Sequence, residues 1–426
     1  MDGERERSSN RSKGLIQLAA RVAISLGALI QLVFEQKLGL HTFFGQRETG
    51  HDVALPPLGA RNRLAIKGIL FLRQITGRPG LLEGRLRRAY DRMAESLETA
   101  GWPKGGRLEI ATYRAGEITP REFYRNHVKT GKPALIRNHV KTGKPALIRG
   151  MGHYEAERWS LDFFAEKFPE LHTQVLDLSS GQVFTEPLPG LLPAIKDGKV
   201  KPFQAALDPE QARYFDLGRF ADFFGTTGRL LGSVATYLII GRKRGVNAPM
   251  HCEAGLNWYF ELSGTRHWTL IDAEYSWLLY PSSEGTGMRR FSEYIPDPEG
   301  NPMDAEKYSL VDYAPRYELD LHPGDILYHP AWMWHKTLGL EDHCVGIRFN
   351  FVAPTPMPHR FFRFLQLISP EFWTLSAEYL SAILGNADQA EREKSSTTYN
   401  DCEVALWQQT AAEWERSAAA DEERPG

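Results

Sequence analysis

Residues 247–257 read NAPMHCEAGLN, and this stretch carries the pattern that decides the fold. His251 and Glu253 are separated by one residue, so on a strand their side chains project from the same face. Residues 323–335, PGDILYHPAWMWH, supply a further imidazole, that of His335. Two imidazoles and one carboxylate have the composition of a facial triad, which leaves open positions on Fe(II). The His-x-Glu pair alone is a weak signal, and the second stretch makes an iron site the working hypothesis.

Length and composition limit the class of protein. The chain has 426 residues and a net charge of −2, which suits one large domain with extensions, or two domains. The balanced charge gives no global basic field of the kind that indicates nucleic-acid binding. The three cysteines, Cys252, Cys344 and Cys402, form no CxxC pair and no disulfide framework, so we predict a reducing intracellular compartment, cytoplasm or nucleus. Cys252 lies between the two candidate ligands and should therefore face the core.

The N-terminal part of the chain predicts a helical extension over residues 14–106, preceded by a disordered stretch at 1–13. Residues 14–34 are largely apolar but reach the length of a membrane span only by including Arg21 and several other polar residues. Two interpretations stay open for this segment, a buried or interfacial helix and a membrane anchor. A cluster of basic residues further on is interpreted as a solvated helix face: Arg85, Arg87, Arg88 and Arg92.

The globular domain is predicted to span residues 107–355. It opens on an alternating strand at 107–113. Thr119 and Glu122 then form a capping box around Pro120 and Arg121, which predicts the start of a short helix.

A perfect repeat follows, because residues 125–136 (RNHVKTGKPALI) recur unchanged as residues 137–148. Repeat arrays need at least three units to bury a core, so we interpret this as a local duplication or an error in the sequence. Only one copy can fill the helix–turn–strand slot, and the other is expected to form a loop. His127 and its duplicate, His139, are interpreted as surface histidines.

From residue 231 onward the pattern becomes a series of short strands separated by Gly, Pro and Asp turns. This pattern predicts a mainly β fold, a double-stranded β-helix of the jelly-roll or cupin type, with flanking N- and C-terminal helices. The expected strands are 233–240, 250–253, 258–262, 267–271, 317–321, 325–329 and 345–352. A long polar segment at 282–312 is expected to form a loop that covers substrate. Residues 356–418 should form amphipathic helices, a candidate homodimer contact, before a tail at 419–426.

The motifs together resemble the JmjC/cupin-like Fe(II)- and 2-oxoglutarate-dependent oxygenases. The stretches that carry the likeness are 238–253, 262–271, 323–335 and 346–351. The pattern is similar to that of the asparaginyl hydroxylase group around factor inhibiting HIF. The resemblance covers about residues 107–355 and is specific for fold and metal, much less so for substrate.

The resemblance implies a role for individual residues. His251, Glu253 and His335 match the iron ligands, although the family often has Asp in place of Glu253. Arg266 falls where relatives carry a Lys that pairs with the distal carboxylate of 2-oxoglutarate, and its planar fork suits a carboxylate. Arg348 is an alternative anchor for the same carboxylate.

Two asparagines and one departure complete the comparison of motifs. Asn257 and Asn350 match polar residues that face the cosubstrate and the metal. The hydroxyl-bearing Thr that relatives have shortly before the first ligand is Ala248 here. The nearby aromatic residues Trp332 and Trp334 are interpreted as core residues, with a pocket wall as the alternative.

The implied function is a 2-oxoglutarate-dependent dioxygenase, a hydroxylase or demethylase, with succinate and CO2 as coproducts. A protein or peptide side chain is the expected substrate. The same chemistry on a small molecule, a lipid or an RNA base is the first alternative, and a non-catalytic cupin-type binding module is the second. Membrane association through residues 14–34 would favour a lipid or membrane-protein substrate.

Overall fold

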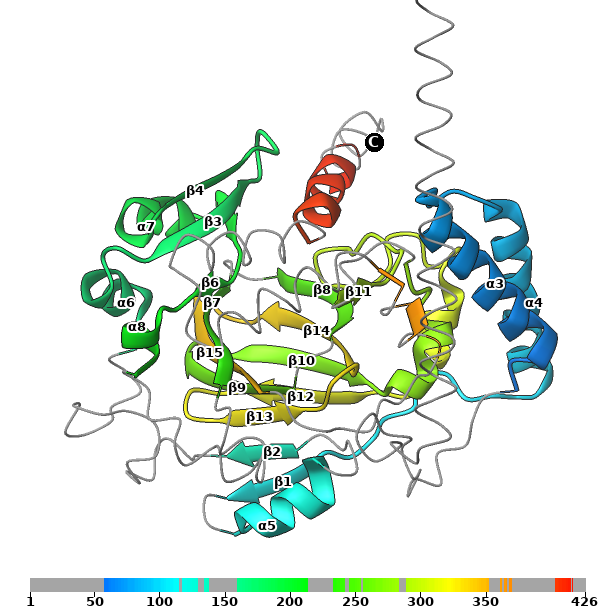
Figure 1. The fold of residues 1–426 in the computed structure, drawn as a ribbon, viewed down its shortest axis with the longest axis horizontal. Coiled ribbons are helices and arrows are strands. Elements are labelled where there is room, and N and C mark those ends of the chain that lie inside the picture. The colour runs from blue at the N-terminus through cyan, green and yellow to red at the C-terminus, as the bar shows by residue number, and fades with distance from the viewer. Residues whose placement is uncertain are drawn as a thin grey trace, which may run out of the picture.

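The computed structural model describes residues 57–114, 117–128, 134–137, 159–213, 233–241, 245–253, 256–282 and 289–351, with shorter stretches at 361, 364–365, 368–369, 403–414 and 416. Its centre is a pair of stacked β-sheets (Figure 1). The larger sheet has seven strands in the order β1-β2-β13-β9-β15-β7-β6, and the smaller has five in the order β11-β8-β14-β10-β12. The predicted mainly β, cupin-type jelly roll is therefore confirmed.

Eight strands form the jelly roll, and consecutive strands mostly alternate between the two sheets. Within each of the two sheets, neighbouring jelly-roll strands pair antiparallel. They are β7 (Ser233–Gly241), β8 (Gly245–Glu253), β9 (Leu256–Ser263), β10 (Arg266–Ile271), β12 (Tyr317–Leu321), β13 (Ile326–His329), β14 (Trp334–Gly339) and β15 (Cys344–Phe351). The space between the two sheets is thus lined by alternate residues of every strand.

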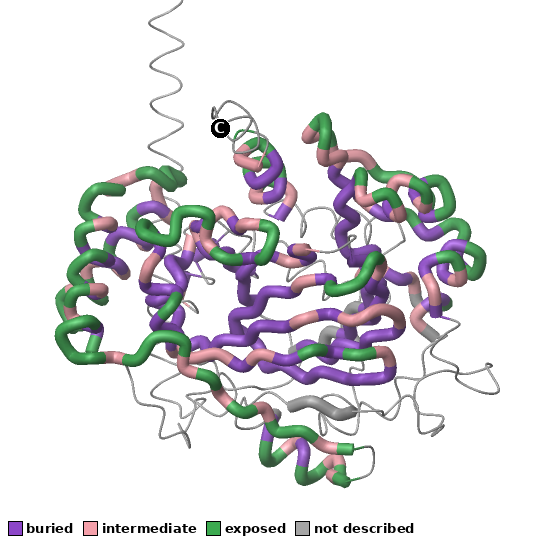
Figure 2. The backbone as a smooth tube through the Cα atoms, turned by 180° about the vertical axis from the view of Figure 1, so that it is seen from behind, coloured by how far each residue is buried: buried purple, intermediate pink, exposed green. Residues whose placement is uncertain are grey.

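The core between the sheets is filled by large apolar side chains. Tyr259 of β9 and Trp268 of β10 meet edge to face, with ring centroids 4.9 Å apart. They belong to a buried cluster that also holds Leu319 and Leu327, one from each sheet. In Figure 2 the buried residues follow the stacked sheets, and the exposed residues lie mostly on the helices around them.

Helices and a small third sheet flank the jelly roll. The helices α3 (Ala60–Thr76) and α4 (Glu83–Thr99) pack against each other at one end. At the other end lies the three-stranded sheet β4-β3-β5 with two helices beside it (Figure 1). The elements there are β3 (His172–Asp177), β4 (Val183–Pro187), β5 (Val200–Pro202), α6 (Leu161–Lys167) and α7 (Leu188–Lys196).

Several local predictions hold. The capping box at Thr119 starts α5 (Pro120–Phe123), with the side chains of Thr119 and Glu122 each bonded to the other's backbone N–H. Of the four arginines expected on a solvated face, three are exposed on α4, whereas Arg87 is half-buried between Glu83 and Tyr308. Cys252 is buried in the core, as its position between the ligands predicts.

Two local predictions were wrong. His127 is buried, because its Nε2 lies 3.0 Å from the Tyr113 hydroxyl and its ring packs on Phe123. The segment 282–312 is not one continuous loop. It contains β11 (Arg289–Phe291), which pairs antiparallel with β8 and becomes the edge of the five-stranded sheet.

The duplicated segment is described for the first copy only in part. Residues 134–137 form β2 (Ala134–Arg137), which pairs with β1 (Ala111–Arg114) on one side and with β13 on the other. Residues 138–148 of the second copy, the apolar segment 14–34 and most of the predicted helices at 356–418 lie outside the described residues, so those predictions remain open. No helix among the described residues is long and apolar enough to cross a membrane.

Candidate metal centre

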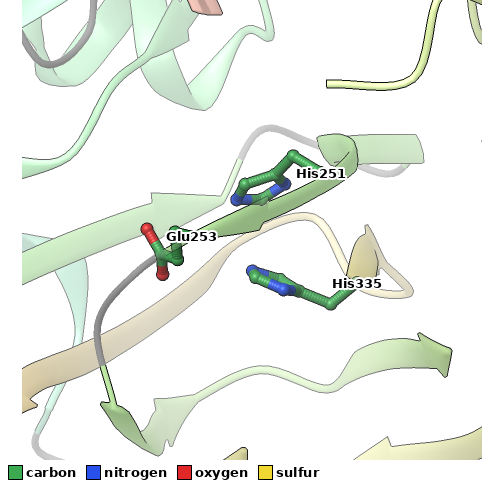
Figure 3. A group of neighbouring side chains, drawn as sticks. All are labelled: His251, Glu253 and His335. Carbon is green, nitrogen blue, oxygen red and sulfur yellow. The ribbon is translucent and has the colours of Figure 1, made fainter. Parts of the chain in front are cut away.

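His251, Glu253 and His335 meet inside the jelly roll (Figure 3). The first two come from the end of β8 and the third from the start of β14, where His335 lies directly opposite His251 in the strand register. One potential ligand atom from each side chain lies within 4.8 Å of those of the other two, and all three residues are buried. The three residues that the sequence singled out are therefore brought together by one pair of strands.

Hydrogen bonds fix the orientation of both imidazoles. Nδ1 of His251 lies 2.8 Å from the Pro249 carbonyl, and Nδ1 of His335 lies 3.0 Å from the Met333 carbonyl. A carbonyl oxygen can only accept a hydrogen bond, so each ring carries its hydrogen on Nδ1. The Nε2 of each ring is then left with a lone pair that can bind a metal. Within the described part of the chain, His251 Nε2 is buried without a hydrogen-bond partner. This is the arrangement that metal-binding histidines commonly show.

Both histidines are held neutral. Burial lowers the pKa of His335 to about 4 and that of His251 well below its usual value, and each is also affected by neighbouring charges. A metal binds only the deprotonated form of an imidazole. At neutral pH neither ring has to lose a proton before it binds a cation.

Glu253 is surrounded by an amide donor and two positively charged guanidinium groups. Asn257 Nδ2 donates to Oε1 at 2.5 Å, and Arg348 Nη1 lies 2.9 Å from Oε1 and 3.1 Å from Oε2. Arg289 Nε is 3.5 Å from Oε2. Burial by itself would raise the pKa of Glu253, but the guanidinium groups of Arg348 and Arg289 outweigh it and hold the pKa well below the usual range. Glu253 is therefore a carboxylate at any physiological pH.

The backbone links the two halves of the triad as well. The N–H of Trp332 donates to the carbonyl of Glu253 at 2.7 Å. Trp332 has φ 62°, a left-handed conformation that a bulky residue adopts only when its surroundings impose it. This tight turn carries the chain from β13 into β14 and sets the position of His335 against β8.

A cavity of about 60 Å³ opens beside the triad. Both triad histidines line it, as do Arg266, Tyr259 and Arg348. Arg266 is buried, and its Nε donates to Glu261 Oε2 at 3.1 Å. Among the described residues, Arg266 Nη2 and the Tyr259 hydroxyl have no hydrogen-bond partner. The cavity thus combines two imidazoles with a wall that carries unused donors.

Two glycines keep that wall open. A Cβ on Gly346 would lie 2.2 Å from the Tyr259 hydroxyl oxygen, and a Cβ on Gly241 would lie 3.2 Å from Arg266 Nη2. The first contact is far closer than packing allows, so only glycine leaves the tyrosine in place, and the second is tight enough that the guanidinium would have to shift by a few tenths of an ångström.

Both candidate anchors line the cavity, and each is paired with a buried glutamate. Arg266 Nε donates to Glu261, and Arg348 Nη1 donates to Glu253 of the triad. Asn257 contacts the triad directly through Glu253. Asn350 lies opposite Asn257 in the strand register, but its side chain is outside the described set. Trp332 and Trp334 are buried in the hydrophobic core, as predicted.

Several residues that line the cavity were not singled out by the sequence, among them His329, Thr337, Arg289 and Glu403. His329 packs on His335 with ring centroids 4.4 Å apart. Thr337 of β14 lies opposite Ala248 of β8. Arg289 belongs to β11 and Glu403 to helix 403–414. Period-2 counting from His335 and from Leu327 could have found Thr337 and His329, whereas nothing local marks Arg289 or Glu403.

The donor set fits a divalent transition metal. Two neutral imidazoles and one ionised carboxylate on a single face are the ligands that non-haem Fe(II) takes in oxygenases. The comparison with protein families agrees with the fold. Residues 160–355 match the family model described as Cupin-like domain, which spans β3 to β15 and includes all three triad residues.

Proposed function

We propose that the protein is an Fe(II)- and 2-oxoglutarate-dependent oxygenase that hydroxylates a side chain of a protein or peptide. One observation carries the proposal, namely that a single cavity is lined both by the triad histidines and by a buried arginine with an unused Nη2. The cupin-like domain family includes 2-oxoglutarate oxygenases, which supports the same reaction class. The choice of a protein substrate rests on the resemblance of the motifs alone.

His251, Glu253 and His335 would hold the iron. Their Nε2 and carboxylate atoms converge from two adjacent strands. The Nδ1–carbonyl bonds keep the rings from rotating, so little conformational entropy is lost when a cation binds. Asn257, through its bond to Oε1, orients the carboxylate.

Arg266 would hold the distal carboxylate of 2-oxoglutarate. Its Nη2 and the Tyr259 hydroxyl are two donors without partners at the wall of the cavity, and a carboxylate has the acceptors that they lack. Thr337 supports this reading, because it lines the cavity directly opposite Ala248. A threonine on the neighbouring strand thus supplies a hydroxyl where Ala248 has none.

Bound together, Fe(II) and 2-oxoglutarate supply the oxidising chemistry, in which O2 is consumed, 2-oxoglutarate becomes succinate and CO2, and a C–H bond of the substrate is hydroxylated. The chain supplies geometry and access. Trp268 and His329 pack against His335 and shield it from water on that side. The buried ion pairs around Glu253 keep its charge constant across the pH range in which such an enzyme would work.

A second candidate, a non-catalytic cupin-type binding module, is favoured by one contact. Arg348 Nη1 lies within hydrogen-bond distance of both oxygens of Glu253, a position from which a guanidinium could replace a metal ion. The two candidates differ in what they bind, because only the oxygenase requires a metal at the triad.

Succinate release by the purified full chain, with Fe(II), 2-oxoglutarate and O2, tests the proposal. We expect turnover in the wild type, none in His251→Ala, and a higher requirement for 2-oxoglutarate in Arg266→Ala. Asp162→Asn, in an exposed ion pair with Lys196, is the control that should behave as the wild type. A wild-type chain that binds no Fe(II) would favour the binding module instead.

A further inference from the structure

A chain of four buried charges leads away from the candidate metal centre. Glu253 lies 3.5 Å from Arg289 Nε, and Nη1 of the same guanidinium donates to Glu403 Oε2 at 2.7 Å. The other oxygen of Glu403 lies 3.5 Å from Lys201 Nζ. All four residues are buried, and the charges alternate in sign from Glu253 to Lys201.

Glu403 comes from helix 403–414, beyond the segment that matches the cupin-like family model. This is the red helix of Figure 1, which lies close to β8 and β11. Hydrogen bonds and packing hold this helix against the rest of the chain. Trp414 Nε1 donates to the Pro296 carbonyl at 2.9 Å, Gln408 Nε2 donates to the Gly181 carbonyl at 2.9 Å, and Trp407 packs in a cluster with Phe203.

We propose that Glu403 is a positioning residue for the candidate metal ligand Glu253 and that it acts through Arg289. The inference rests on the metal centre of the proposed function. Arg289 makes its shorter contact with Glu403 and its longer one with Glu253. Glu403 therefore draws the guanidinium toward itself and limits its hold on the ligand carboxylate.

The Arg289 guanidinium and a metal ion would compete for the carboxylate of Glu253. A buried arginine that lost Glu403 would pair more fully with the nearest remaining carboxylate, which is Glu253, because an unpaired buried charge is strongly unfavourable. A metal ion would then have to displace the guanidinium from its own ligand. Burial favours the neutral form of Glu403, but Lys201 and Arg289 lower its pKa below the usual value, so Glu403 remains charged and keeps its hold on Arg289.

The same contact couples the C-terminal helix to the metal centre. If docking of helix 403–414 favours metal binding, metal binding must favour docking of the helix to the same extent. A segment outside the cupin-like match thereby becomes part of the site.

Titration of the full chain with Co(II) alone, without 2-oxoglutarate, tests the inference. Glu403→Gln keeps the shape of the side chain and removes its charge. Changes to residues that orient metal ligands commonly cost about 10- to 100-fold in metal affinity, and we expect a loss in that range. Two control variants lie on the same helix. Glu413→Gln changes an exposed ion pair with Arg416, and Trp414→Phe removes the bond to Pro296.

We expect Glu413→Gln to bind Co(II) as the wild type does, and Trp414→Phe to lower the urea midpoint of unfolding more than the Co(II) affinity. The double variant Glu403→Gln with Arg289→Gln removes the competing guanidinium and should recover part of the lost affinity. A purely structural role for Glu403 predicts no such recovery.

Three results would overturn the inference. Wild-type affinity in Glu403→Gln, or a double variant that binds no better than the single one, would contradict it while leaving the metal centre intact. A wild-type chain that binds no Co(II) would contradict the proposed function, and the inference would fail with it.

Discussion

Glu253 and Glu261 are two buried glutamates of the same jelly roll, and each lies beside an arginine, yet their pKa values shift in opposite directions. Glu253 has two guanidinium groups and an amide around it, and its pKa lies well below the usual range. Glu261 has one contact, from Arg266 Nε, and its Oε1 has no partner among the described residues. Burial raises the pKa of Glu261 to about 8 despite that arginine.

The difference shows that one arginine does not compensate for the desolvation of a buried carboxylate, whereas two arginines and an amide do. The consequence is a division of labour. Glu253 stays charged and suits a metal ligand. Glu261 is largely protonated at neutral pH, so it leaves most of the positive charge of Arg266 available to an anion in the cavity.

The largest expected effect separates the two acids directly. Glu253→Gln removes the charge that two buried arginines share and should destabilise the metal-free chain by about 3–5 kcal/mol. Glu261→Gln replaces a group that is already mostly neutral at pH 7 and should cost less than about 1 kcal/mol. Urea unfolding of both full-length variants at pH 7 checks this. Equal losses would break the comparison.

The next effect concerns the arginine that Glu261 leaves available. Arg266→Ala should weaken binding of 2-oxoglutarate to the metal-loaded chain by about 10- to 100-fold, because a hydrogen bond to a charged group contributes about 1.5–3 kcal/mol. Arg266→Lys keeps the charge but loses the forked guanidinium, so its affinity for 2-oxoglutarate should lie between those of the wild type and Arg266→Ala. Isothermal titration measures the affinities. An Arg266→Ala variant with unchanged affinity would move the anchor to Arg348.

How much of this the sequence could predict depends on the range of the interactions. The triad and the strands β7, β9, β10, β12 and β15 follow from local pattern, because alternation and turn residues are properties of neighbouring positions. The strand β11 was predicted as loop, since a three-residue strand at the sheet edge has too few residues to show a period.

The charges around Glu253 were beyond local pattern. Arg289 reaches Glu253 only because β11 pairs in register with β8, and Glu403 arrives from a helix far along the chain. The residues next to Arg289 and Glu403 in the sequence form no pattern from which either contact could have been predicted. Arg348 was predicted as an alternative cosubstrate anchor, and only the structure shows that it also contacts the ligand carboxylate.

An effect of intermediate size is expected in the pH dependence of folding stability, and it tests the comparison of Glu253 with Glu261. Glu261 is expected to ionise near its ordinary value of 4.5 when unfolded and at about 8 when folded. Between these values the folded chain keeps a proton that the unfolded chain has released, so this residue makes stability fall as pH rises, by at most about 1.4 kcal/mol per pH unit. In urea unfolding from pH 5 to pH 8, the stability of Glu261→Gln relative to the wild type should therefore increase as the pH rises.

Glu253 should act with the opposite sign. Its folded pKa lies below the unfolded one, so its contribution to stability is present above the unfolded pKa and is lost as the pH falls through the folded one. A Glu261→Gln profile as steep as that of the wild type would show that Glu261 is ionised like Glu253.

The smallest expected effect is that of the Tyr259 hydroxyl. Tyr259→Phe removes a donor that has no partner among the described residues, so stability should change by less than about 1 kcal/mol. Affinity for 2-oxoglutarate should fall by about two- to tenfold, the contribution of one ordinary hydrogen bond. A loss as large as that of Arg266→Ala would mean that the hydroxyl, and not the guanidinium, is the main anchor.

The central claim is that one cavity holds both Fe(II) at the triad and 2-oxoglutarate against Arg266. The most direct measurement is an anaerobic titration of the Fe(II)-loaded full chain with 2-oxoglutarate, followed by the visible charge-transfer band that appears when a 2-oxo acid chelates Fe(II). We predict a band that saturates at one equivalent, that is absent in His335→Ala, and that requires more 2-oxoglutarate in Arg266→Ala. A wild-type chain that retains Fe(II) without developing the band, or that retains no Fe(II), would contradict the claim.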